Sequence, residues 1–299
     1  MTLELKRITK SYGAKKALSG FSFAAESGSA TVLLGRNGAG KTTVLKIATG
    51  ALAPDSGEIL IDGKPLDRNT VKLGNIPDER ELAPRLKVSE VLSGMAKLKG
   101  IPARRALESA ACLLRRMDAE QCLYQKLESL SKGNQKKVML ALALADDPDI
   151  LTLDEPFVGL DPINQSLLKN MIEERVKAGK TVIFSSQQMP PFEEVCSNIC
   201  ILRNGESVLQ GTLSEIKKSY PRDLLRIVPE SCAESLALKL RAMPQAAVVR
   251  QEGPAVLVRL LSPSCKADVL AAAVDFGIDS FSMGEPSLAQ IFMEAAGAM

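Results

Sequence analysis

The chain contains the segment Gly35-Arg36-Asn37-Gly38-Ala39-Gly40-Lys41-Thr42-Thr43, which directly follows the apolar run 30–34. The apolar run predicts a buried strand, and a helix is expected to begin at the end of the glycine-rich segment. Glycines let backbone N–H groups curl around phosphate oxygens, while Lys41 can reach the outer phosphates and the Thr42 hydroxyl can ligate magnesium. The dipole of the following helix also favours an anion. We therefore assign all nine residues to a nucleotide-binding site.

The composition is that of a globular protein. The 299 residues are 45% hydrophobic and 24% charged, which fits one large domain plus a smaller one. Basic and acidic residues are interspersed, the net charge is +3 and only 4% of residues are aromatic, so no nucleic-acid partner is expected. Residues 1–16 lack an apolar signal core, and runs such as 138–145 are too short to span a membrane. We expect the chain to stay in the cytoplasm.

Six cysteines and no histidine limit the metal chemistry that the chain can offer. The cysteines form no CxxC pair, and in a cytosolic protein they are expected to be small, reduced core residues rather than disulfides. A structural zinc site needs four ligands, so we do not expect metal binding by cysteine. The cysteines lie at positions 112, 122, 196, 200, 232 and 265.

Three further motifs follow the glycine-rich segment. The stretch 130–135 reads Leu-Ser-Lys-Gly-Asn-Gln and precedes an apolar helix, 149–156 forms an apolar strand that ends in Asp-Glu-Pro, and 159–161 reads Gly-Leu-Asp. In this order the motifs resemble the Walker A loop, signature, Walker B strand and D-loop of the ATP-binding cassette (ABC) ATPases. The resemblance extends from about residue 3 to residue 211. It implies an α/β P-loop NTPase core with an N-terminal antiparallel β element and a helical subdomain at about 85–145.

The resemblance assigns a role to each motif. Asp154 would hold magnesium directly or through water, and Glu155 would polarise the water that attacks the γ-phosphate, with Lys41 on the phosphates. Ser131 and Gly133 lie where a helix begins and can point a hydroxyl and N–H groups at an anion. In the family this anion is ATP held by a second subunit, so two subunits enclose two ATP molecules. Asp161 of the D-loop is included in the nucleotide site.

Two further motifs resemble parts of the family's nucleotide site. Tyr12 within Ser-Tyr-Gly resembles the A-loop residue that stacks on adenine, although a tyrosine after a short strand is often only a partly exposed β residue. The stretch 74–80 resembles the Q-loop region, where a glutamine usually reaches magnesium. Asp78 stands at that position here. A carboxylate is also an oxygen ligand, so Asp78 is a candidate magnesium ligand with a shorter reach.

The apolar run 181–186 predicts a strand whose end normally carries a histidine in this family, and this chain has Gln187 there. A glutamine amide can donate a hydrogen bond to phosphate but does not titrate near neutral pH. We therefore predict a slow ATPase whose ATP-bound dimer is long-lived. The competing interpretation is that Gln187 suffices because Glu155 does most of the work.

The family motifs end near residue 211, and we place a domain boundary after residue 220, which gives domains 1–220 and 221–299. The second segment has the alternation βαββαβα, which predicts a ferredoxin-like α+β domain with a terminal helix. Its ending, 285–292, resembles that of many bacterial drug- or antibiotic-exporter ATPases. The expected elements are strand 224–228, helix 231–243, strands 246–251 and 255–261, helix 266–276, strand 279–283 and helix 287–296.

These features favour the ATP-binding and ATP-hydrolysing subunit of an ABC exporter, with ATP and Mg²⁺ as its ligands. Its partners would be a second ATP-binding subunit, identical or different, and a separate transmembrane permease that holds it on the inner face of the membrane. An alternative is an ATP-dependent regulatory switch, or a degenerate half of a heterodimer, with little hydrolysis. A soluble ABC ATPase of DNA repair or translation agrees less well, because the chain has no long coiled-coil insert or basic arm.

Overall fold

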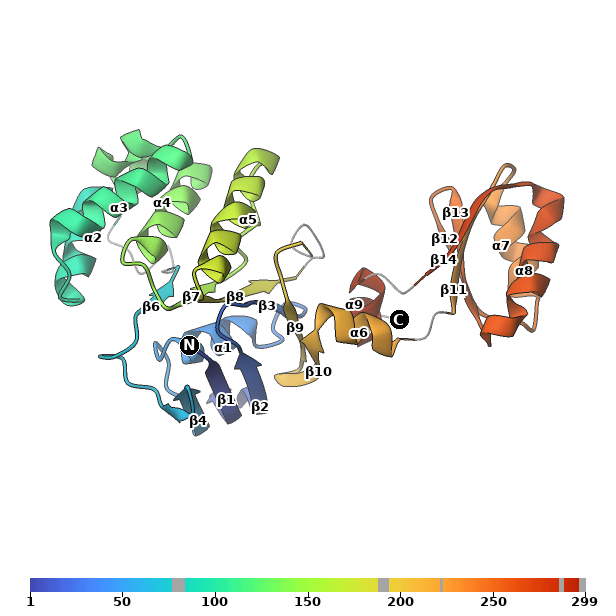
Figure 1. Ribbon diagram of the computed structural model, residues 1–299, viewed down its shortest axis with the longest axis horizontal. Helices are drawn as coiled ribbons and strands as arrows, with labels where there is room; N and C mark the ends of the chain where they lie inside the picture. Colours follow the sequence, from blue (N-terminus) through green and yellow to red (C-terminus); the bar gives the residue numbers. More distant parts are fainter. Residues whose placement is uncertain (77–83, 188–193, 221–222, 285–287, 296–299) are drawn as a thin grey trace. The chain divides into compact units, whose positions relative to one another are not determined.

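The computed structural model describes residues 1–76, 84–187, 194–220, 223–284 and 288–295. The chain divides into two compact units, Met1–Thr212 and Leu213–Met299 (Figure 1). Each unit has a hydrophobic core of its own. The second unit opens with α6 (Leu213–Ser219). The predicted domain division after residue 220 stays a prediction.

An antiparallel sheet forms the N-terminal part of the first unit, as predicted. Its strands lie in the order β2-β1-β4-β5. Alternate residues of β1, Leu3 and Leu5, are buried against the core, and Phe21 and Phe23 of β2 stack in the same cluster. The strands are β1 (Leu3–Tyr12), β2 (Lys15–Ala25), β4 (Ser56–Ile61) and β5 (Lys64–Pro65).

A second sheet, mostly parallel, carries the glycine-rich loop. Its order is β10-β9-β3-β8-β7-β6, with only β10 antiparallel to its neighbour. Every residue of β3, β7 and β8 is buried, as expected for central parallel strands covered on both faces. The strands are β3 (Ala30–Leu34), β6 (Leu73–Asn75), β7 (Ile150–Leu153), β8 (Thr181–Ser186), β9 (Asn198–Arg203) and β10 (Glu206–Thr212), with helices α1 (Lys41–Ala48) and α5 (Pro162–Lys177).

A group of helices forms the predicted helical subdomain (Figure 1). Buried side chains such as Val88 and Leu92 of α2 and Leu114 of α3 pack its interior, and every residue from Val138 to Leu144 of α4 is buried. Such an all-round apolar segment is typical of a helix enclosed by its neighbours. The elements are α2 (Val88–Leu98), α3 (Ala103–Arg116), the short 3₁₀ helices Glu120–Tyr124 and Leu127–Ser129, and α4 (Lys132–Leu144).

The second unit contains a four-stranded antiparallel sheet in the order β12-β13-β11-β14. This order, with helices after the first and third strands, is that of the predicted ferredoxin-like plait. Leu225, Ile227, Val256 and Val258 of the sheet pack with Leu236 of α7. The elements are β11 (Leu224–Pro229), α7 (Ala233–Arg241), β12 (Ala246–Glu252), β13 (Ala255–Leu260), α8 (Lys266–Ala273), β14 (Ile278–Gly284) and α9 (Leu288–Ala295).

The cysteine prediction was correct for half of the cysteines. Cys122 and Cys200 are buried, and burial raises the pKa of the Cys200 thiol to about 12. Cys112 and Cys232, in contrast, are exposed. The prediction was wrong for these two because a lone cysteine can also occupy the outer side of a helix or its N-terminus, as both do.

No helix in the described ranges is long and apolar enough to cross a membrane.

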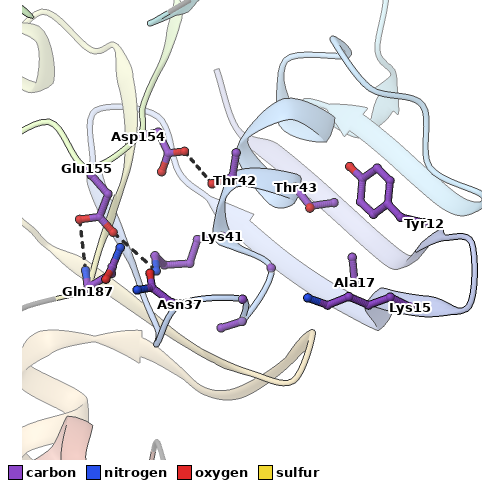
Figure 2. Close-up of a pocket in the computed structure, with 13 residues that line it drawn as sticks. Tyr12, Lys15, Ala17, Asn37, Lys41, Thr42, Thr43, Asp154, Glu155 and Gln187 are labelled. Atoms are coloured by element: carbon purple, nitrogen blue, oxygen red, sulfur yellow. Dashed lines mark hydrogen bonds and ion pairs between the residues drawn. The ribbon is translucent and has the colours of Figure 1, made fainter. Parts of the chain in front are cut away.

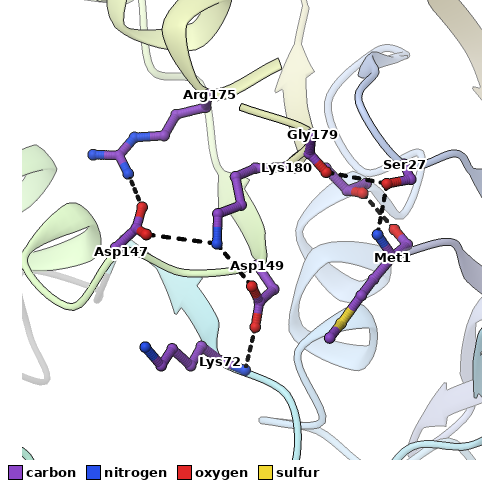
Figure 3. Close-up of polar contacts among 9 residues, drawn as sticks. Met1, Ser27, Lys72, Asp147, Asp149, Arg175, Gly179 and Lys180 are labelled. Atoms are coloured by element: carbon purple, nitrogen blue, oxygen red, sulfur yellow. Dashed lines mark hydrogen bonds and ion pairs between the residues drawn. The ribbon is translucent and has the colours of Figure 1, made fainter. Parts of the chain in front are cut away.

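An ionic network joins the starts of β7 and β8, at the opposite ends of these strands from the glycine-rich loop (Figure 3). Lys180 Nζ donates to Asp149 Oδ1 at 2.8 Å and lies 3.5 Å from Asp147, which also pairs with Arg175. The backbone N–H of Lys72 donates to Asp149 at 3.3 Å, which adds β6 to the group. The network therefore links the N-terminal ends of three neighbouring parallel strands, β6, β7 and β8.

We expect Lys180→Met to lower the free energy of unfolding by about 1–2 kcal/mol, because it leaves the partly buried Asp149 without its ion pair. Side-chain exposure is only 21% for Lys180 and 24% for Asp149, so solvent screens the pair incompletely. Denaturant titration at pH 7 measures the effect. Lys177→Met, which breaks an exposed pair with Glu173, is the matched control and should change the free energy far less. An equal loss in both variants would contradict the prediction.

The contribution of this pair should also depend on pH. Partial burial alone would raise the pKa of Asp149, but hydrogen bonds from Lys180 and the Lys72 backbone together lower it from its ordinary 3.8. The hydrogen bond to Asp149 raises the pKa of Lys180 above 10.5. The Lys180–Asp149 pair therefore stabilises the fold fully between the two ordinary pKa values, 3.8 and 10.5. This stabilisation is lost as pH falls through the lowered pKa of Asp149 or rises through the raised pKa of Lys180. The difference in the free energy of unfolding between wild type and Lys180→Met should therefore shrink at pH values outside that range.

Candidate functional site

The glycine-rich loop joins the end of β3 to the start of α1. Gly40 has φ of 109°, and a Cβ there would lie 2.8 Å from the Ala17 carbonyl oxygen and 2.9 Å from Leu18 Cδ2. Glycine is therefore required at this position. The N-cap residue of α1 is Gly40, which has no side chain to cap the helix. Its first backbone N–H groups are consequently left for an anion seated in the loop.

A pocket of about 430 Å³ opens above this loop (Figure 2). Its size is in the range of small-molecule sites. It brings together residues from the first hairpin, the loop and the ends of β7 and β8. The lining residues are Tyr12, Lys15, Ala17, Asn37, Gly38, Ala39, Gly40, Lys41, Thr42, Thr43, Asp154, Glu155 and Gln187.

Lys41 and Glu155 form the charged centre of the pocket. Lys41 is only 6% exposed; its Nζ donates to the Gly35 carbonyl oxygen at 2.7 Å and lies 3.5 Å from Glu155 Oε1. The backbone N–H of Gln187 donates to the other carboxylate oxygen at 3.3 Å. Glu155 Oε1 is buried and accepts no hydrogen bond from the residues that the structure describes. This oxygen is therefore placed to accept a hydrogen bond from a ligand or a water.

The backbone of Glu155 is held in an unusual conformation. Its φ is 46°, in the left-handed region that non-glycine residues rarely occupy. Its backbone N–H donates to Ser185 Oγ at 2.8 Å, and Ser185 in turn donates to Asp154. The end of β8 thus orients both carboxylates at the end of β7.

Thr42 and Asp154 offer a set of oxygen ligands. Thr42 Oγ1 donates to Asp154 Oδ2 at 2.7 Å, so a hydroxyl and a carboxylate meet directly beside the glycine-rich loop. Hydroxyl and carboxylate oxygens are the donors that Mg²⁺ prefers, and it usually completes its shell with waters and substrate phosphates. The residues present fit this ion. Asp78, the third predicted ligand, lies outside the described residues.

Lys15 and Ala17 line the pocket although sequence analysis did not select them. Lys15 is paired with Tyr12 across the turn Gly13-Ala14, and Tyr12 is 51% exposed. Lys15 Nζ lies 3.9 Å from where a Cβ on Gly38 would stand, and no described carboxylate pairs with it. The two-residue turn was the signal that could have revealed Lys15, because residues that flank such a turn share one face of the hairpin.

If the pocket is the ATP site that the sequence motifs predict, Lys15→Met should raise KM for ATP about three- to tenfold at low salt with little change in kcat, because an exposed ammonium would attract the phosphates without acting on bond cleavage. Steady-state kinetics at two salt concentrations test this, and the effect should shrink at the higher one. Lys16→Met is the matched control: Lys16 is the next residue of β2, so its side chain points to the other face. A similar rise in KM for both variants would rule out a specific role for Lys15.

Of the predicted residues that the structure describes, five do not line the pocket. Gly35 and Arg36 are hydrogen-bonded to a residue of the pocket, since their carbonyl oxygens accept hydrogen bonds from Lys41 Nζ. Ser131 caps α4 by accepting the Asn134 N–H at 3.3 Å, and Gly133 follows in the first turn of that helix. Asp161 caps α5 by accepting the Asn164 N–H, and this hydrogen bond lowers the pKa of Asp161. Within one chain, Ser131 and Asp161 therefore act as helix caps.

Comparisons with known proteins agree with this geometry. The profile of the family "ABC transporter" matches residues 18–158, and that of the "ATP-binding protein DrrA1-3-like, C-terminal domain" matches residues 211–296. The solved dimeric structure of a bacterial ABC transporter cassette is 26% identical, with a TM-score of 0.63, over 71% of this chain and 98% of that one. The class defined by the fold and the pocket is thus that of the ABC ATPases.

Two curated relatives match over nearly the whole chain and a third over about seven tenths of it. The ABC transporter ATP-binding protein YhaQ of Bacillus subtilis is 34% identical over 99% of both chains. The linearmycin resistance ATP-binding protein LnrL of the same organism is 28% identical over 99% of this chain and 98% of its own. The Nod factor export ATP-binding protein I of Paraburkholderia xenovorans is 33% identical over 72% of both chains. The protein belongs to the ABC transporter ATP-binding family, as an ATP-binding subunit with a DrrA-like C-terminal domain.

Proposed function

We propose that the protein hydrolyses Mg-ATP at the described pocket to drive an ABC exporter, and that it does so slowly. The observation that carries the proposal is the Glu155 carboxylate held beside Lys41, with one buried oxygen that accepts no hydrogen bond from the described residues. A carboxylate placed in this way can accept a hydrogen bond from a water near the γ-phosphate. The residue that normally completes such a site is replaced by Gln187.

Different residues of the pocket bind different parts of Mg-ATP. Tyr12 stacks on the adenine, the N–H groups of the loop and of the α1 N-terminus hold the phosphates, and Lys41 pairs with the outer ones. Thr42 and Asp154 would hold Mg²⁺ through their oxygens, and Asp78 stays a predicted third ligand outside the described residues. When bound, the ion neutralises part of the phosphate charge. Lys41 is already desolvated, so its charge acts strongly on a bound phosphate.

Glu155 orients the attacking water and takes up its proton as the water oxygen bonds to the γ-phosphorus. The bond between that phosphorus and the oxygen bridging to the β-phosphate breaks at the same time, and ADP leaves. The backbone N–H of Gln187 fixes one carboxylate oxygen, and the Gln187 amide can donate one hydrogen bond to the phosphate. It cannot carry a positive charge at neutral pH. The transition state gains less stabilisation than it would from a histidine, so we expect turnover to be slow.

We further propose that two subunits complete each other's sites. Ser131, Gly133 and Asp161 do not line the pocket of their own chain, and Ser131 and Gly133 stand at the N-terminus of α4 where an anion is favoured. The relative described as dimeric has the same cassette fold. ATP held by one chain would then meet the α4 N-terminus of its partner. The partner is either a second copy or a related chain.

The transport direction is proposed from the relatives. Two of them are named for Nod factor export and for linearmycin resistance, and the second also shares the full length of this chain. We place the protein on the inner face of the cell membrane, bound to a separate permease. Residues 221–299 are proposed as an accessory domain of the same subunit.

A second candidate is an ATP-gated switch, or the degenerate half of a heterodimer, that binds ATP tightly but hardly hydrolyses it. The replacement at Gln187 favours this candidate, because binding uses Lys41 and the loop whereas turnover needs every positioning group. The two candidates differ in rate and in partner, not in fold.

Steady-state hydrolysis of Mg-ATP by the purified chain tests the proposal, alone and with a co-purified membrane subunit. Glu155→Gln provides the background. Turnover well above that background, stimulated by the membrane subunit, is the expected result. Tight ATP binding with turnover no higher than the Glu155→Gln background would instead favour the switch, and absence of ATP binding would overturn both candidates.

A further inference from the structure

The loop between β7 and α5 is held by two side chains from helices. Lys136 of α4 donates from Nζ to the carbonyl oxygen of Glu155 at 3.1 Å and also to that of Val158. Gln165 of α5 donates from Nε2 to the carbonyl oxygen of Leu160 at 3.0 Å and contacts that of Phe157 at 3.4 Å. Four carbonyl groups of this short loop therefore accept hydrogen bonds from these two side chains.

Lys136 is the charged member of the two, and it comes from the helical subdomain. It lies in the second turn of α4, the helix that Ser131 caps. A hydrogen bond from an ammonium is stronger than one between neutral groups. Lys136 therefore forms a direct link between the helix of the signature motif and the backbone that carries Glu155.

The Glu155 backbone needs such support. Its φ of 46° is unfavourable for a residue with a side chain, and such a conformation persists only where surrounding contacts fix it. Ser185 holds the N–H group of Glu155, and Lys136 holds its carbonyl oxygen. The peptide groups on both sides of the Glu155 Cα are thus anchored, from two different elements.

We propose that Lys136 is a positioning residue for ATP hydrolysis: it fixes the backbone of Glu155 so that the carboxylate stays beside Lys41, and it makes this geometry depend on the position of α4. The proposal rests on the proposed function, in which Glu155 polarises the attacking water. Lys136 is not among the described residues that line the pocket, but it contacts Glu155 and the loop that follows, so we expect it to act on hydrolysis through them.

Lys136→Met should lower the single-turnover rate of ATP hydrolysis about ten- to a hundredfold, because small displacements of a catalytic group are costly, and should leave ATP affinity within about twofold. Lys136→Arg should restore much of the rate, since it also donates from a positive charge. Fluorescent-nucleotide binding and thermal unfolding are measured on the same samples. A folded Lys136→Met protein with the wild-type rate would overturn the proposal.

Lys137→Met is the matched control. The neighbouring Lys137 donates to the carbonyl oxygen of Met117 at 2.7 Å, a bond of the same kind that stays inside the helical subdomain. Its removal should change stability but leave the hydrolysis rate within about twofold. An equal loss of rate in both variants would mean that any damage to α4 slows hydrolysis, and would overturn a specific role for Lys136.

A double variant separates this inference from the proposed function. In a Glu155→Gln background, Lys136→Met should cause no further loss, because the group that Lys136 positions has already lost its function. A further loss of the same factor would show that Lys136 acts independently of Glu155 and would overturn the inference alone. If Glu155→Gln itself hydrolysed ATP at the wild-type rate, the proposed function would fail, and the inference with it.

Discussion

Gln187→His is expected to raise the single-turnover rate of Mg-ATP hydrolysis roughly thirty- to a thousandfold, the gain that corresponds to about 2–4 kcal/mol of transition-state stabilisation. Gln187 lies at the end of β8, where its backbone N–H already donates to Glu155 and its side chain lines the pocket. A histidine there would have the same backbone contact. Its imidazole could also hold phosphate and water together, which a glutamine amide does less well.

Two controls make the Gln187→His result specific. Gln187→Ala should not accelerate hydrolysis, because it only removes a donor. The histidine variant should also acquire a pH dependence near about pH 6.5, since imidazole titrates there and an amide does not. If the rate of Gln187→His equals that of the wild type, the view that Gln187 makes the enzyme slow is wrong, and Glu155 alone determines the rate.

Much of the fold was predictable because its signals are local. The apolar runs of β3 and β7 predicted buried strands. Because the sheet is parallel, the C-terminal ends of these strands lie on the same side, where the glycine-rich loop meets Asp154 and Glu155. The C-terminal plait was predictable from its alternation of short strands and helices. Its observed boundaries differ from the expected ones by a few residues, mostly at the ends of α7 and α8.

The support of the site was not predictable from the sequence. Lys136 and Gln165 belong to apolar and polar helix patterns that give no sign of a distant partner, and their contacts with the 155–160 loop exist only after α4 and α5 have packed. The left-handed backbone of Glu155 has no sequence signal either, since glutamate is not a residue that favours positive φ. The chemical groups were thus predictable from motifs, whereas the contacts that hold them required the tertiary structure.

Glu155→Gln is expected to lower steady-state turnover at least about a hundredfold, and to leave ATP binding intact or tighter. The substitution keeps the size of the side chain but removes the proton acceptor. It also removes a negative charge that lies 3.5 Å from Lys41 Nζ. Lys41 is then free to pair more fully with the phosphates, and one carboxylate no longer repels them. ATP titration and steady-state kinetics on the same preparation measure both effects.

The same variant should accumulate as an ATP-bound dimer, because hydrolysis is the step that would reopen it. Light scattering after size exclusion, with and without Mg-ATP, measures the mass of the complex. Combining Glu155→Gln with Ser131→Arg should keep the chain monomeric: Ser131 stands at the exposed N-terminus of α4, and a large side chain there would block the approach of ATP held by a partner. A Glu155→Gln protein that binds ATP tightly yet stays monomeric would contradict the proposed homodimer. It would leave a heterodimer with a different chain, in which Gln187 belongs to the slower of two sites.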